Sequence, residues 1–169
     1  DRLDAAGVER LVDLDGGWGE TILQSRLDAF KQHLPDRIWC FGGINWEAWR
    51  EHPDDFGEYA AKRLEIQKTK GADGLKIWKN LGLSLKDPNG KRVPINDRRL
   101  DPIWGKAADL SFPVTIHIAD PVAFFDPIDE RNERYEELKA HPAWQYPGDR
   151  FPSFAQLMAE FVDLISRHP

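Results

Sequence analysis

The chain has 169 residues, the length of one ordinary domain, with 41% hydrophobic and 31% charged residues and a formal net charge of −6. Nine Phe, seven Trp and three Tyr argue against disorder, and the lack of any run of about 18 apolar residues excludes a membrane-spanning helix. Scattered basic residues argue against a nucleic-acid-binding surface, while a single cysteine, Cys40, and no visible leader segment predict a cytoplasmic protein.

Segments typical of strands and helices alternate along the first half of the chain. Short runs of aliphatic and aromatic residues predict strands, and apolar residues at helical spacing predict helices. Gly71 marks the C-terminal end of one helix. In chain order we predict a strand at Val8–Asp15, a helix at Glu20–Leu34, a strand at Arg37–Ile44, a helix at Asp54–Lys70 and a strand at Gly74–Trp78.

The second half continues the alternation and adds two long polar segments. The first spans residues 79–99 and contains a predicted turn at 87–90, where Asp, Pro, Asn and Gly follow one another. The second, 120–150, is predicted to be an elaborated loop whose acidic centre, 128–138, fits a solvated helix. The regular elements predicted here are a helix at Leu100–Leu110, a strand at Val114–Ala119 and a helix at Phe154–Arg167.

Strands that alternate with helical crossovers predict parallel βαβ units. Side chains of a strand alternate between its two faces, so Leu75 and Ile77 form an aliphatic face of the third strand and Lys76 lies on the other. In the first strand, alternation assigns Val12 to the face beneath the helices and Asp13 to the polar face. A face that is polar at one end fits the mouth of a barrel better than a sheet covered on both sides. We therefore predict a partial (β/α)8 TIM barrel with four parallel strands in sequence order, the alternative being a compact open α/β sheet.

Ligands of parallel α/β folds bind beyond the carboxyl ends of the strands, which makes residues there the candidates for a site. Lys76 lies on the third predicted strand and His117 near the end of the fourth. The side chains predicted to line a substrate pocket are Trp18, Trp46, Trp78 and Asp120.

Lys76 and His117 each have more than one interpretation. The ammonium group of Lys76 can pair with a substrate carboxylate, or its neutral amine can form a metal-bridging carbamate; the alternative is a structural ion pair with Asp13 or Asp15. Imidazole is a common ligand of transition metals and an acid or base near neutral pH, so His117 is a candidate metal ligand. Its alternative is a buried histidine hydrogen-bonded to a neighbour.

Four segments carry a resemblance to a known family. They are GVERLVDLDGGWG at 7–19, GADGLKIWKNLGLSLKD at 71–87, PVTIHIADPVAFFDPIDERNERYEEL at 113–138 and FPSFAQLMAEFVDLISRHP at 151–169. Together they resemble the amidohydrolase-2 branch of the amidohydrolase superfamily, relatives of aminocarboxymuconate-semialdehyde decarboxylase. The most specific of them is the strand IHIADP with the FFDPIDERN loop that follows it.

The resemblance implies a metal-dependent (β/α)8 barrel. His117 matches the metal-ligand histidine of the family's fifth strand, and Lys76 matches a fourth-strand position where some relatives carry a carboxylated lysine. The family's H-x-H pair would precede Asp1, and its last metal ligands would follow Pro169. Residues 1–169 would then form one incomplete barrel segment, the second to fifth βα units.

The function implied is that of a metal-dependent hydrolase acting on C–N or C–O bonds of a small molecule. The alternatives are a non-oxidative decarboxylase of a small carboxylic acid and a non-catalytic α/β fragment. The expected cofactor is a divalent metal, zinc first and manganese, iron or nickel as alternatives, bound weakly by these residues alone. Because four strands cannot close a barrel, exposed strand edges predict self-association; no membrane or nucleic-acid partner is expected.

Overall fold

The computed structural model of the chain describes residues 2–14, 20–119 and 121–169. Its strands are β1 (Leu11–Asp13), β2 (Ile38–Gly42), β3 (Gly74–Ile77) and β4 (Val114–Ile116). Its α-helices are α1 (Arg2–Ala5), α2 (Glu20–Arg26), α3 (Phe56–Lys70), α4 (Asn80–Leu83), α5 (Asp101–Asp109), α6 (Tyr135–Ala140) and α7 (Phe154–Arg167). Shorter 3-10 or π-helical segments are η1 (Leu27–Lys31), η2 (Trp46–Arg50), η3 (Arg98–Leu100), η4 (Val122–Phe125) and η5 (Pro142–Trp144). None of the helices described here is long and apolar enough to cross a membrane.

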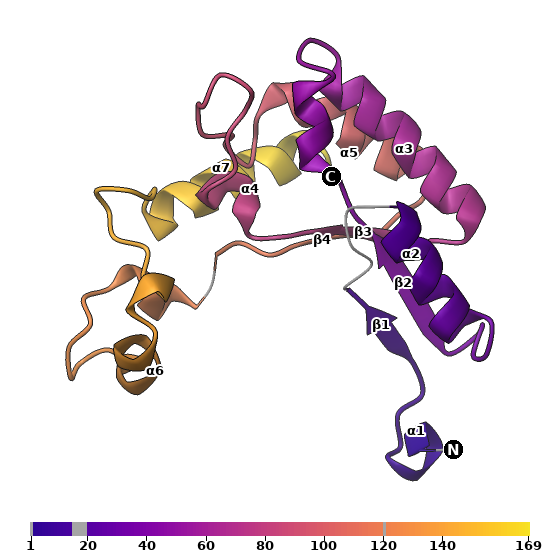
Figure 1. Cartoon of the computed structure of the whole chain (residues 1–169), viewed down its shortest axis with the longest axis horizontal. Coiled ribbons are helices and arrows are strands. Elements are labelled where there is room, and N and C mark those ends of the chain that lie inside the picture. Colours follow the sequence, from indigo (N-terminus) through magenta and orange to yellow (C-terminus); the bar gives the residue numbers. More distant parts are fainter. Residues whose placement is uncertain (1, 15–19, 120) are drawn as a thin grey trace. The chain divides into compact units, whose positions relative to one another are not determined.

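The four strands form one parallel sheet in the order β1-β2-β3-β4, which is also their order along the chain (Figure 1). Helices α2, α3 and α5 lie in the crossovers that lead to β2, β3 and β4. Parallel strands in sequence order, joined through helices, are the construction of a (β/α)8 barrel. The predicted fold class, a partial (β/α)8 barrel of about four βα units, is therefore confirmed. The alternative, an open sheet with a permuted strand order, does not fit the order β1-β2-β3-β4.

The chain separates into two compact units. The sheet unit comprises Asp1–Ile77 and Arg98–Ile116 and holds all four strands with α1, α2, α3 and α5. The loop unit comprises Trp78–Asp97 and His117–Pro169 and holds α4, α6 and α7. Each unit has its own fully buried side chains: Leu23, Leu64, Leu75, Ile77 and Ile103 in the sheet unit, and Leu81, Ile95, Leu138 and Leu157 in the loop unit.

In the sheet unit, α3 and α5 pack side by side (Figure 1). Gly57, in the first turn of α3, allows the chain that enters α5 to come close, because a Cβ atom there would lie 2.1 Å from the carbonyl oxygen of Arg99. Gln67 of the same helix is buried, and its amide accepts a hydrogen bond from the N–H of Gly43 at 3.1 Å and donates one to its carbonyl at 2.9 Å. These contacts fix α3 against both the end of β2 and the start of α5.

The side-chain faces of β1 are reversed relative to the prediction. In the parallel register Val12 is paired with Trp39 and Asp13 with Cys40, and paired residues of parallel strands project from the same face. Asp13 thus shares the helix-covered face with buried Cys40, where its carboxylate binds Arg26 of α2 at 3.0 Å. Val12 and Trp39 are each more than 40% exposed on the other face. The prediction was wrong because it assigned the apolar side chains of β1 to the helix-covered face, whereas the ion pair between Asp13 and Arg26 lies on that face.

Element boundaries were predicted best where a cap marks them. Helix α3 ends at Gly71, whose φ of 110° provides the left-handed cap expected, and α7 begins after Ser153, whose hydroxyl accepts a hydrogen bond from the N–H of Gln156. The strand predicted at Val114–Ala119 stops at Ile116, and the helix predicted at Glu20–Leu34 turns π-helical after Arg26. The predicted turn at 87–90 is present, closed by a hydrogen bond from the N–H of residue 90 to the carbonyl of residue 87.

We expect Gly57→Ala and Gly105→Ala to act in opposite directions, although both glycines lie in helices. Gly57→Ala places a methyl group against the Arg99 carbonyl and lowers the free energy of unfolding by about 1–3 kcal/mol. A methyl group at Gly105 would meet no described atom within 4 Å, so Gly105→Ala raises that free energy by about 0.5–1 kcal/mol through helix propensity. Urea unfolding of both variants measures the difference, and equal effects would contradict the close approach at Gly57.

We propose that the exposed face of β1 and β2 makes the isolated 169-residue chain self-associate. Val12 and Trp39, which share this face, are 44% and 42% exposed, and apolar side chains gathered beside a strand edge favour association. Trp39→Ser is expected to shift sedimentation toward monomer. Trp144→Ser, which removes a comparably exposed tryptophan from the loop unit, should leave the distribution unchanged. A wild-type chain that stays monomeric at all concentrations would overturn the proposal.

Candidate active site

Lys76 lies within β3 and is only 7% exposed. Its register partner is Thr115 of β4, and both side chains leave the sheet on the face opposite Leu75 and Ile77. On the same face Gly74 makes room for the ring of Phe41, since a Cβ atom at Gly74 would lie 2.6 Å from that ring. The predicted face of Lys76 is confirmed, and burial of its amine in this setting is costly unless surrounding groups compensate the charge.

The structural ion pair between Lys76 and Asp13 is excluded by the reversed face of β1. Asp13 lies on the opposite side of the sheet and holds Arg26 with both carboxylate oxygens, at 3.0 and 3.2 Å. Asp15, the other proposed partner, lies outside the described residues. One of the two structural interpretations of Lys76 is thereby removed.

Cys40 is not a candidate nucleophile. It is fully buried on the helix-covered face, and burial raises the pKa of its thiol, an effect to which the nearby carboxylates of Asp13 and Asp73 add. Asp73 also accepts a hydrogen bond from the backbone N–H of Cys40 at 2.8 Å and binds Lys31 at 2.6 Å. This cluster connects β2 to the segments before β2 and β3, and its role is structural.

Trp46 follows β2 as predicted and begins η2, where the Asn45 side chain accepts a hydrogen bond from the N–H of Glu47. Its ring lies 5.8 Å from that of Phe56, and Trp49 stacks on the other side of this cluster, 4.4 Å from Phe56. Trp46 is partly exposed, so its packing leaves part of the indole available at the end of the strand. Its role in a substrate pocket stays a prediction.

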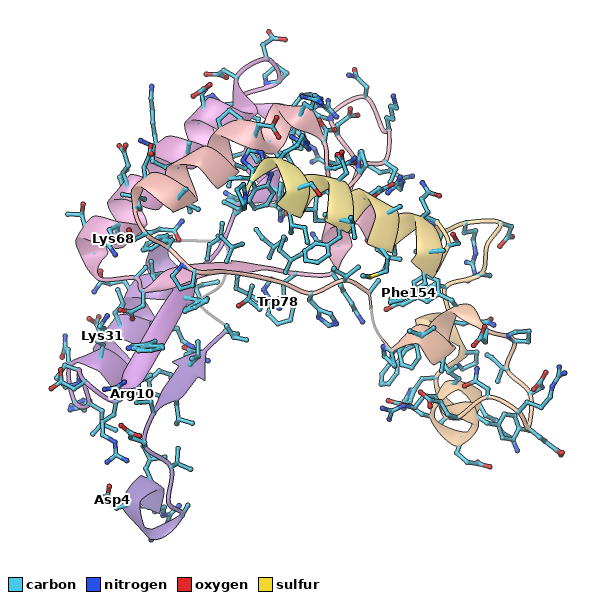
Figure 2. All side chains as sticks on the ribbon, turned by 180° about the vertical axis from the view of Figure 1, so that it is seen from behind. Asp4, Arg10, Lys31, Lys68, Trp78 and Phe154 are labelled. Atoms are coloured by element: carbon cyan, nitrogen blue, oxygen red, sulfur yellow. The ribbon has the colours of Figure 1, made fainter. Side chains whose placement is uncertain are left out.

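Two further candidates, Trp78 and His117, belong to the loop unit. Trp78 directly follows β3 (Figure 2), and His117 directly follows β4; both are partly buried. His117 was predicted on the strand and lies just beyond it, because the chain turns at Ala119. Ala119 has a φ of 39°, a left-handed conformation that is unfavourable for alanine, and its side chain is buried. Strain of this kind is often found at functional sites.

The described residues do not assemble a metal centre. Within residues 2–14, 20–119 and 121–169, no three His, Cys, Asp or Glu side chains are grouped so that they could hold an ion. His117 is thus a single candidate ligand within that part of the chain. Trp18 and Asp120, the remaining predicted pocket residues, lie outside the described residues.

An aromatic cluster in the loop unit, not predicted from the sequence, surrounds Tyr146. The centre of the Tyr146 ring lies 5.9 Å from that of Phe124, 5.1 Å from that of Phe125 and 5.3 Å from that of Phe151. The backbone N–H of Tyr146 donates a hydrogen bond to the carbonyl of Phe124. Phe125 in turn contacts Phe154 at the start of α7 (Figure 2). The Nζ atom of Lys79, two residues beyond β3, lies 5.5 Å from the centre of the Tyr146 ring. The scattered spacing of these aromatics gave no periodic signal.

The acidic centre of the long loop forms a turn before it becomes helical. The buried Asn132 amide donates to the carbonyls of Ala123 and Pro127, at 2.8 and 3.0 Å, and its oxygen accepts from the N–H of Arg134. Hydrogen bonds from Arg131 lower the pKa of the partly exposed Asp129. The predicted helix at 128–138 is therefore limited to α6, which starts at Tyr135.

The buried carboxylate of Glu160, in α7, accepts four hydrogen bonds within the loop unit. It receives two hydrogen bonds from Arg92, at 3.0 and 2.5 Å, one from the N–H of Ile95 at 3.1 Å and one from Gln156 at 3.1 Å. Burial by itself would raise the pKa of Glu160, but these donors outweigh it and lower the pKa below its ordinary value. The polar segment 79–99 is thereby attached to α7, an interaction that neither segment's sequence revealed.

Comparison with known proteins identifies a similar fold. No protein-family model matches the sequence, and no curated protein matches it. Among solved structures, the chain is similar to 2,6-dihydroxybenzoate decarboxylase from Rhizobium, with 20% sequence identity and a TM-score of 0.53. The match covers 99% of this chain and 51% of that one, so the chain spans about half the length of that barrel. At this identity the likeness establishes the partial barrel fold.

We expect Glu160→Gln to destabilise the loop unit in a pH-dependent manner. Because the pKa of Glu160 is lowered in the folded state, its contribution is present above the pKa of an unfolded glutamate and is lost as the pH falls through the folded value. Glu160→Gln should therefore lower the free energy of unfolding by about 2–3 kcal/mol at pH 7 and by much less at pH 3. Urea unfolding at both pH values measures this.

The matched control is Glu136→Gln, an exposed glutamate of α6. It should leave stability unchanged at either pH. A loss for Glu160→Gln that is the same at pH 7 and pH 3 would show that the side chain contributes through packing rather than through charge.

Proposed function

We propose that these residues form part of a metal-dependent barrel enzyme of the amidohydrolase-2 type, which removes CO2 from a small aromatic acid. The observation that carries the proposal is the superposition of 99% of the chain on a decarboxylase of dihydroxybenzoate, with the strands in barrel order. The motifs at 71–87 and 113–138, which resemble that family, support it independently. The hydrolysis of C–N or C–O bonds is the second candidate, supported by the same motifs, since family members catalyse both reactions.

The proposal concerns the whole protein, because a metal centre needs more ligands than the described residues provide. Catalytic sites of this kind usually hold the ion with three protein ligands, and His117 is the one assigned here. The resemblance places the others on the first, sixth and eighth strands of a complete barrel. A single imidazole without further ligands has no chelate advantage, so the isolated chain is expected to bind zinc or manganese weakly.

The remaining residues are assigned roles toward the substrate. In non-oxidative decarboxylation the bond between the ring carbon and the carboxyl carbon breaks, CO2 leaves, and a proton takes its place on the ring. Lys76, as the catalytic residue, places a buried positive charge near the reacting carboxylate. Trp46 and Trp78, together with Trp18 and Asp120, are assigned to the walls of the substrate pocket, where indole rings stack on an aromatic acid.

We expect the full-length protein, supplied with zinc or manganese, to release CO2 from 2,6-dihydroxybenzoate or a related hydroxybenzoate. Lys76→Met should lower kcat by about 100-fold or more, since preorganised charges at a reacting centre commonly contribute that much. His117→Ala should remove both the activity and the stoichiometric metal measured after dialysis. His33→Ala, which changes an exposed histidine after η1, should alter neither.

Two results would contradict the proposal. Hydrolysis of esters or amides without any CO2 release from aromatic acids would establish the second candidate. Full activity and metal content in His117→Ala would show that the metal, if it is used, is held elsewhere.

A further inference from the structure

A small cavity in the sheet unit lies where the chain enters α3 and α5. Its walls are formed by Trp49 of η2, residues 53–58, Arg98, Arg99 and Pro102, all of which belong to this one compact unit. Its volume is about 170 Å³. Because a water molecule occupies about 30 Å³ of the liquid, the cavity has room for a ligand of several non-hydrogen atoms.

The wall of this cavity contains a buried hydrogen-bond donor. Trp49 is 2% exposed, and its indole N–H has no acceptor among the described residues. Phe56 stacks on the ring at 4.4 Å, and the guanidinium group of Arg99 lies over it, 4.8 Å from the ring centre. These contacts occupy faces of the ring and leave the edge that carries the N–H. A buried donor without an acceptor is costly, and a ligand in the cavity that Trp49 lines can supply the acceptor.

The start of α3 provides further donors to the same cavity. The first N–H groups of a helix have no partner within it, and α3 is a helix of 15 residues. The side chain of Asp55, directly before α3, does not cap these groups; its Oδ1 instead lies 3.3 Å from Nδ1 of His52. Gly57 packs against the carbonyl of Arg99, which fixes the start of α3 against the segment that leads into α5. An anionic group is favoured at such a helix end.

The rim of the cavity carries charges of both signs. Arg98 and Arg99 are exposed on the segment before α5, and Asp54, Asp55 and Glu58 are exposed around the start of α3. A dianion such as phosphate would be repelled by three carboxylates. A molecule with one carboxylate and one ammonium group has a partner of opposite charge on either segment.

We propose that this cavity binds a small α-amino acid as its zwitterion. The carboxylate of the ligand accepts from the indole N–H of Trp49 and from first-turn N–H groups of α3, and the ammonium group donates to Asp54. Neither Lys76 nor His117 lines the cavity, so binding here does not depend on the proposed function.

Calorimetric titration of the full-length protein with glycine, acetate and methylamine tests the site. Acetate lacks the ammonium group and methylamine lacks the carboxylate, so glycine is expected to bind about tenfold or more tightly than either. Trp49→Phe keeps an aromatic ring and removes the N–H; it should weaken glycine and acetate about tenfold and leave methylamine unchanged. Asp54→Asn should weaken glycine about tenfold without weakening acetate.

Trp104→Phe is the matched control. The indole N–H of Trp104, in α5, is also buried without an acceptor among the described residues, but Trp104 does not line the cavity. Its replacement should leave glycine binding unchanged. Circular dichroism spectra of each variant establish that it is folded.

Several outcomes would overturn the proposal. Glycine that binds no more tightly than acetate would show that the ammonium group is not recognised. Wild-type glycine affinity in Trp49→Phe, or an equal loss in Trp104→Phe, would show that the indole N–H of Trp49 does not contact the ligand. Inorganic phosphate that binds more tightly than glycine, and depends on Trp49, would identify a site for a free oxyanion instead of a zwitterion.

Discussion

Parallel pairing in register is the constraint on which the rest of the sheet unit depends. Because paired residues of parallel strands project from the same face, one register assigns every side chain of β1 to β4 to the helices or to the opposite face. It places Asp13 beside Cys40 beneath α2 and sets Lys76 beside Thr115 on the other face. A shift of one residue at β3 would exchange Lys76 with Leu75 or Ile77 and bury the ammonium group against α3 and α5.

How much of the fold the sequence predicts depends on how local the signal is. The C-terminal end of α3 was predicted because Gly71 acts through neighbouring backbone groups, and α7 was predicted because its apolar residues recur at helical spacing. The orientation of β1 was predicted wrongly, because Asp13 faces the helices only through its ion pair with Arg26 of α2. A strand of three residues also contains too little alternation to show which face is apolar. The contact between Glu160 and Arg92, which are 68 residues apart, and the rings around Tyr146 were likewise not predicted.

Each unit has a polar cluster that joins segments distant in the chain. In the sheet unit, Asp73 binds Lys31 and the backbone of Cys40. In the loop unit, Glu160 binds Arg92 and the backbone of Ile95. In both, the carboxylate accepts from a cation and from a backbone N–H together, so its charge is matched and an otherwise unpaired donor is satisfied. These carboxylates already have their partners, which is why we assign the two clusters to stability.

The backbone at Ala119 provides a separate argument about the end of β4. A left-handed φ costs an alanine about 1–2 kcal/mol relative to the right-handed region, and glycine at this position would avoid that cost. The buried methyl group of Ala119 offsets part of it through packing, but the turn also determines what precedes it. By ending the strand at Ile116, it places His117 at the start of the turn, outside the hydrogen-bonded ladder, where an imidazole can be oriented by the loop. A regular strand through residue 119 would have fixed that ring by the pleat of the sheet alone. With β4 ended at Ile116, the orientation of His117 is set by the loop that leads to Ala119 and not by the pleat of the sheet.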